Sequence, residues 1–86
     1  MRDLTAYHLL LDAMTEVSEA SGATHDALRR LTAYQRASPD DAATTDVIDG
    51  RLHAVAVELF RIHRKLRERA RDCIHRDAAR THLHQD

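Results

Sequence analysis

The sequence predicts an all-α protein that folds as a long antiparallel helical hairpin, and three observations lead to this fold class. The 86 residues include only two Gly and one Pro, too few for the tight turns of an all-β protein. Apolar residues recur at steps of three and four along both halves of the chain. The proline lies between these halves, where one helix can end and another begin. We expect a single domain over residues 1–80 and a frayed tail over 81–86.

The first helix is predicted over about residues 3–36, because one face of this segment is apolar throughout. Near its middle, Gly22 lies within the polar run Ser21–Thr24, and the helical register continues through it. A kink or break near Gly22, with Thr24 capping a new helix, remains an alternative. The apolar face consists of Leu4, Tyr7, Leu10, Leu11, Met14, Val17, Leu28, Leu31 and Tyr34.

The second helix is predicted over about residues 39–80. Ser38 is suited to an N-cap, Pro39 to the first helical position, and two aspartates follow at the positive end of the helix dipole. Gly50 weakens the prediction, since an interior glycine costs about 1 kcal/mol, but the apolar register continues through it. A heptad seam interrupted at Arg69 is expected from Thr45, Ile48, Leu52, Val55, Leu59, Ile62, Leu66 and Cys73.

Pairing the two helices predicts the core of the hairpin. A turn at Ala37–Ser38 brings Val17 beside Leu59, and it brings Gly22 beside Ala54, where small residues would allow a close backbone approach. The side chains expected to form the seam are Leu11, Met14, Leu28, Leu31, Ile48, Leu52, Val55, Leu59, Ile62 and Leu66.

A second apolar face predicts that the hairpin associates with another molecule. Alanines recur at intervals of seven in the first helix, and the second helix carries Val57 and Phe60 off its seam. Alanine also raises helix propensity on an exposed surface, which is the alternative interpretation. Because one two-helix seam is a small core, we expect a dimeric four-helix bundle or a hairpin docked on another protein. The alanines are Ala6, Ala13, Ala20 and Ala27.

Charge is segregated along the chain, although the formal net charge is only −1. Residues 1–60 carry five Arg and ten acids, whereas 61–80 carry seven Arg and one Lys against three acids. The preferred function is a non-catalytic adaptor, regulator or inhibitor that binds a second copy or another protein. Aromatic and arginine side chains dominate interfaces, so the expected partner contacts are Val57, Phe60, Arg61, Arg64, Arg67 and Arg71.

The alternative function is a nucleic-acid-binding regulator, because several cations lie on one stripe of the second helix and could follow a phosphate backbone. No interleaved aromatic residue or known nucleic-acid-binding motif supports it. Surface pairs three or four residues apart, such as Arg64 with Glu68 and Asp72 with Arg76, favour an ordinary solvated helix face. The candidate contacts to nucleic acid are Arg64, Lys65, Arg67, Arg71 and His75.

The remaining residues predict neither an enzyme nor a cofactor. Seven histidines are present, but none forms a His-x3-His pair, so no metal site is expected within one chain. Cys73 is expected to be an inert thiol in the seam, typical of a reducing compartment. Without a long apolar run or a signal-peptide pattern, we expect a cytoplasmic protein that does not enter membranes. Fourteen Ala and twelve Arg against one Lys suggest a bacterial or phage origin.

Overall fold

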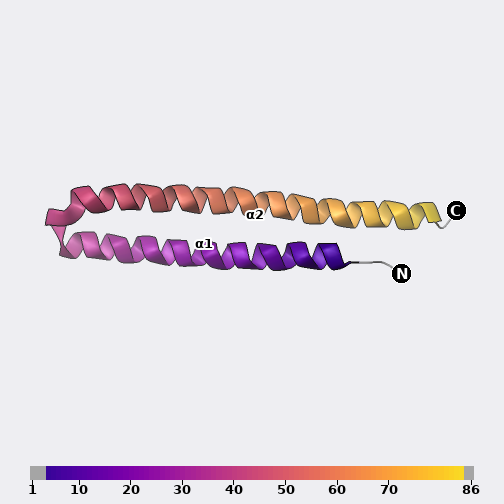
Figure 1. Cartoon of the computed structure of the whole chain (residues 1–86), viewed down its shortest axis with the longest axis horizontal. Helices are drawn as coiled ribbons and strands as arrows, with labels where there is room; N and C mark the ends of the chain where they lie inside the picture. The colour runs from indigo at the N-terminus through magenta and orange to yellow at the C-terminus, as the bar shows by residue number, and fades with distance from the viewer. Residues whose placement is uncertain (1–3, 85–86) are drawn as a thin grey trace.

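The chain forms an antiparallel hairpin of two long helices in the computed structural model, which describes the backbone of residues 4–84 and the side chains of residues 4–76. Helix α1 spans Thr5–Ala37, a 3-10 turn η1 spans Pro39–Asp41, and helix α2 spans Ala42–His84. The two helices lie side by side, and α2 extends past the start of α1 (Figure 1). The molecule measures 72 × 15 × 12 Å, and its radius of gyration of 20.0 Å far exceeds the roughly 12 Å of a compact chain of this length. The predicted hairpin is therefore confirmed.

The turn between the helices consists of residues 38–41 and is fixed by hydrogen bonds. The Ser38 amide donates to the Tyr34 carbonyl oxygen (2.8 Å), which closes α1. The Asp41 amide donates to the Ser38 carbonyl oxygen (3.1 Å), which forms the 3-10 turn that begins at Pro39. Ser38 occupies the N-cap position and Pro39 the first position, as predicted, but they precede the 3-10 turn and the Ser38 side chain makes no capping bond. Helix α2 itself begins three residues later than predicted.

Both glycines lie inside continuous helices, so the alternative of a break at Gly22 is wrong. A Cβ built on Gly22 or on Gly50 would have no neighbouring atom within 4 Å. Gly22 and Ala54 are both exposed, and the expected close approach between them does not occur. The two glycines therefore interrupt neither the helices nor their packing.

The contact face of α1 agrees with the predicted apolar face as far as Leu31. Leu28 is buried and the other predicted residues up to this point are half-buried. Val17 and Leu59 line one groove between the helices, as predicted from the turn. At the end of α1 the structure differs, because Gln35 faces α2 and Tyr34 is exposed. Gln35 is held there by hydrogen bonds from its Nε2 atom to Thr45 Oγ1 (3.0 Å) and Asp46 Oδ1 (3.1 Å).

The contact face of α2 keeps five of the eight predicted seam residues, and Thr45 and Cys73 are among them as buried and half-buried side chains. Leu52, Leu59 and Leu66 lie against α1 as predicted, whereas Ile48, Val55 and Ile62 are exposed and were wrongly assigned to the seam. Two neighbouring lines on a helix share the three- and four-residue spacing, so the spacing does not distinguish them. The line that faces α1 includes two alanines, Ala56 and Ala70, whose small side chains allow the helices to approach closely. Its members are Asp49, Ala56, His63 and Ala70.

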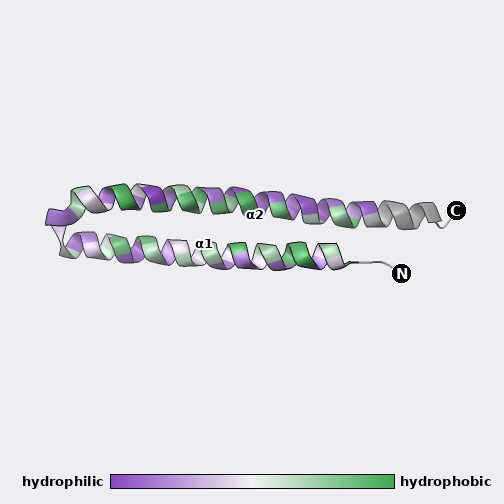
Figure 2. Cartoon of the chain, in the orientation of Figure 1, coloured by the Kyte–Doolittle hydropathy of each residue, from purple (hydrophilic) through white to green (hydrophobic). Residues whose placement is uncertain are grey.

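Very little of the described chain is removed from solvent. Leu28, Ala70 and Thr45 are the only buried residues among those with described side chains. Thr45 is satisfied there, because its hydroxyl donates to the Asp41 carbonyl oxygen (3.1 Å) and accepts from Gln35. Hydrophobic residues are spread along both helices rather than confined to the line between them (Figure 2). The apolar surface of this hairpin is therefore mostly uncovered.

The end of α2 lies beyond the predicted limit at residue 80. The helix continues to His84, so 81–84 belong to it, while residues 85–86 of the expected tail lie outside the described residues. No Gly or Pro follows Gly50, so the sequence contains no residue that would stop the helix. Within 4–84, neither helix has a segment apolar enough to cross a lipid bilayer.

Candidate interaction surfaces

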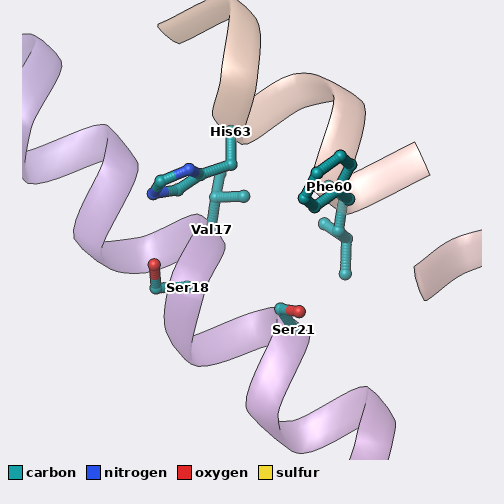
Figure 3. A pocket seen from close by; sticks show the side chains of 6 residues that line it. Val17, Ser18, Ser21, Phe60 and His63 are labelled. Carbon is teal, nitrogen blue, oxygen red and sulfur yellow. The ribbon is translucent and has the colours of Figure 1, made fainter. Parts of the chain in front are cut away.

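The hairpin presents two opposite flanks on either side of the line where α1 and α2 meet. One, called here the Phe60 flank, contains Ser18 and His25 from α1 with His53 and Phe60 from α2, since these residues line two adjoining grooves. In Figure 3, His63 and Phe60 project from α2 towards the part of α1 that carries Ser18 and Ser21. The grooves have volumes of about 210 and 340 Å³. Both grooves are shallow and are lined by polar and apolar side chains, so this flank is suited to contact with the surface of another macromolecule.

The apolar residues predicted to contact a partner are exposed on this side of α2. Phe60 is 66% exposed, the largest exposed fraction among the large apolar side chains described, and Val57 is 49% exposed. Both line the larger groove, together with Ala56. An aromatic ring left this open has apolar surface that a bound partner could remove from water.

The predicted arginine contacts extend from these residues towards the C-terminal end of α2. Arg61, Arg64, Arg67 and Arg71 are all exposed. Arg61 Nη1 lies 3.9 Å from Glu58 Oε2, and both side chains are more than 60% exposed, so this pair contributes at most about 1 kcal/mol. The structure thus brings Val57, Phe60 and the start of the arginine series onto neighbouring turns.

The residues proposed for nucleic acid, Arg64, Lys65, Arg67, Arg71 and His75, are also exposed. The surface pairs expected between this segment and its acids are absent: within residues 64–76, no Arg–Glu or Arg–Asp pair comes within 4.0 Å. Arg76 instead donates to the Cys73 sulfur at 3.9 Å. These cations are therefore available to an external acidic group, of either a protein or a phosphate.

The histidines are spread along the hairpin. His25 Nδ1 donates to the Ser21 carbonyl oxygen (2.7 Å), and His53 Nε2 lies 3.4 Å from Asp49 Oδ2. Of the histidines at positions 8–75, only His63 is half-buried between the helices. In the part of the chain with described side chains, no three His, Cys, Asp or Glu residues are arranged to hold a metal ion. The hydrogen bond of His25 and the ion pair of His53 are each local to one helix.

The opposite flank, called here the alanine flank, was not predicted as a unit, because Ile48, Val55 and Ile62 were assigned to the seam. They are 48%, 46% and 37% exposed. A hydrogen bond from the Tyr34 hydroxyl to Asp41 Oδ2 (3.0 Å) joins α1 to the start of the α2 segment on this side of the hairpin. Tyr34 continues the heptad of the alanines, and Asp41 continues that of the isoleucines and valine. The flank therefore combines these three residues with Ala6, Ala13, Ala20 and Ala27.

Comparison of the chain with protein families, curated proteins and solved structures finds no match in any of the three.

Proposed function

We propose that this chain is a non-catalytic helical interaction module that works as a small adaptor, regulator or inhibitor by binding a second copy or a larger protein. The observation that carries the proposal is the small core of the isolated hairpin. Only two apolar residues with described side chains are buried, whereas nine large ones, Phe60 and Val47 among them, are at least 37% exposed.

The total surface of the chain supports the same proposal. Its accessible area is 6872 Å², compared with about 5,200 Å² for a compact monomer of this mass. The difference of about 1,700 Å² exceeds the roughly 800 Å² that each partner contributes to a standard protein interface. A partner could therefore bury about 800 Å² of this chain, and the accessible area left would still be no smaller than that of a compact monomer of the same mass.

We assign contact with a heterologous protein to the Phe60 flank and the neighbouring arginines. Val57 and Phe60 supply an apolar centre there, and Arg61, Arg64 and Arg67 supply cations at its edge. An apolar centre with a charged rim is the arrangement typical of protein interfaces. A complementary partner would present an apolar groove bordered by carboxylates.

The test is the thermal unfolding of the isolated chain at protein concentrations that differ about a hundredfold, starting in the low micromolar range. If association contributes to the folded state, the unfolding temperature rises with concentration. A hairpin that is fully folded as a monomer at micromolar concentration, with an unfolding temperature independent of concentration, would contradict the proposal.

The second candidate function, binding of nucleic acid, is favoured by the unpaired cations of 64–76. Its test is a fluorescence titration with DNA and RNA at low and at high salt. Binding that weakens steeply with salt is expected of a phosphate-binding surface. Absence of salt-sensitive binding at low ionic strength would eliminate this function.

A further inference from the structure

We infer that the alanine flank is the surface through which two copies of this chain form an antiparallel dimer, with the two-fold axis beside Val55. The inference rests on the proposed function and goes further, because it names the occupant, the residues and the relative orientation. The Phe60 flank, on the other side of the hairpin, stays free for a different protein.

The shape of the alanine flank is suited to another helical pair. α1 contributes only alanines over 6–27, whereas α2 contributes Ile48, Val55 and Ile62. Small side chains allow a facing helix to approach closely, and the larger row supplies apolar area at the centre of the contact. These three residues are between 37% and 48% exposed in the single hairpin. Covering them would convert the two-helix rod into a four-helix bundle.

The row on α2 is self-complementary when a second copy runs in the opposite direction. In a two-fold contact, a residue that touches another is touched by it in return. With the axis beside Val55, Val55 faces Val55 of the second copy, and Ile48 faces Ile62. One heptad further out, the same symmetry places Asp41 of one copy opposite Arg69 of the other. The apolar row thus ends in a pair of opposite charges at both ends.

The row on α1 obeys the same symmetry. Ala20 lies at the level of Val55, so it faces its own equivalent, and Ala13 faces Ala27 of the second copy. At the ends, Ala6 faces Tyr34, which places a small side chain opposite a large one. The register chosen from α2 therefore produces no clash between bulky residues on α1.

Charge favours the antiparallel orientation over the parallel one. Residues 61–76 carry seven Arg or Lys and two acids, whereas 40–49 carry four Asp and no Arg or Lys. In the antiparallel dimer, the basic segment of each copy lies beside the acidic turn of the other. A parallel dimer would place basic segments together and acidic turns together, which is unfavourable.

One further pair of charges borders the proposed contact. Arg51 and Glu58 lie one helical turn after Ile48 and Val55, along the outer edge of the α2 row. The two-fold axis places Arg51 of each copy near Glu58 of the other. Both side chains are exposed, and the described partner of Glu58 is Arg61, 3.9 Å away. The dimer would therefore exchange a weak local contact for an intermolecular one.

The test is disulfide formation between copies of the full chain after removal of its only cysteine by Cys73→Ser. Val55→Cys in this background should give a covalent dimer under mild oxidation. Val57→Cys, a substitution of the same kind at nearly equal exposure but off the alanine flank, should remain a single chain. A mixture of Ile48→Cys and Ile62→Cys proteins should give the mixed dimer in excess of either self-linked product.

Reversing charges tests the same orientation without cysteines. Arg51→Glu and Glu58→Arg should each weaken the dimer by about tenfold or more, because like charges then face each other across the axis. The double variant should restore most of the affinity. If both single variants dimerise as tightly as the native chain, Arg51 of one copy does not lie near Glu58 of the other, and this part of the inferred contact is wrong.

The outcomes separate this inference from the proposed function. If the native chain is a dimer but Val57→Cys links as readily as Val55→Cys, the alanine flank is the wrong surface and the proposed function remains. If Ala20→Cys mixed with Val55→Cys gives the main product, the orientation is parallel and the inference fails. If the native chain is a stable monomer and neither cysteine links, both proposals fail.

Discussion

Replacing Gly22 or Gly50 by alanine should stabilise the protein, because each glycine lies in the interior of a continuous helix. A new methyl group would meet no atom within 4 Å at either position, so it adds neither a clash nor a contact. No described residue has a positive φ, so the backbone at both positions is accessible to alanine. The expected gain is therefore the difference in helix propensity, about 0.5–1 kcal/mol for each substitution.

The two gains should add, because the glycines lie on different helices and neither contacts the other. A gain of 1 kcal/mol corresponds to an increase of about 4–8 °C in the unfolding temperature of a chain of this size. The assay is thermal unfolding followed by far-ultraviolet circular dichroism. All variants must be compared at one protein concentration, because association also raises the unfolding temperature.

Two matched controls are available in the same helices. Ala23 and Ala54 are exposed interior positions, and their replacement by glycine should lower the unfolding temperature by a similar amount. A decrease for Gly22→Ala would refute the reasoning, since it would mean that the chain turns at Gly22 or packs closely against it.

The remaining predictions concern the seam and the turn. Leu59→Ala removes a half-buried side chain from the contact with α1 and should destabilise the protein by about 2 kcal/mol or more in urea unfolding, whereas Val47→Ala, at an exposed position, should change stability by less than about 0.5 kcal/mol. Equal losses of stability in Leu59→Ala and Val47→Ala would contradict the placement of Leu59 in the contact between the helices. Thr45→Val removes the buried hydroxyl that accepts from Gln35 and should cost about 1–2 kcal/mol, while Thr44→Val, at an exposed position, should have little effect. An unchanged free energy of unfolding in Thr45→Val would show that the hydrogen bond between Gln35 and Thr45 contributes little to stability.

The hairpin could be predicted from the sequence because its determinants are local. The apolar spacing, the single proline and the scarcity of glycine each depend on neighbouring residues, and together they specify two helices and one turn. The continuity of both helices through Gly22 and Gly50 followed from the same register. The start of α2 differed by three residues, because the chain tightens into a 3-10 turn at Pro39 before the α-helix begins.

The choice between adjacent lines on α2 could not be predicted, because it depends on contact between two helices. Ile48 and Asp49 both fit the spacing from Thr45, and hydrophobicity favours Ile48. The structure places Asp49 on the inner side, in line with Ala56 and His63. The small alanine at 56 was the available signal for this choice, since a narrow side chain allows the helices to pack closely. This choice leaves Ile48, Val55 and Ile62 exposed.

The candidate surfaces were predicted in part. The exposure of Phe60, Val57 and the arginines followed from their position off the seam. The alanine flank could not be recognised from the sequence, because its larger residues were assigned to the core. Its alanines, however, had already indicated a second apolar face.

The most direct test of the central claim, that this hairpin associates through its uncovered apolar surface, is the mass of the native chain by sedimentation equilibrium at micromolar concentration. The antiparallel dimer predicts twice the 9.8 kDa chain mass. The Ile48→Glu and Ile62→Glu variants should reduce this mass towards that of one chain. A native chain that sediments as a fully helical 9.8 kDa monomer would contradict the account.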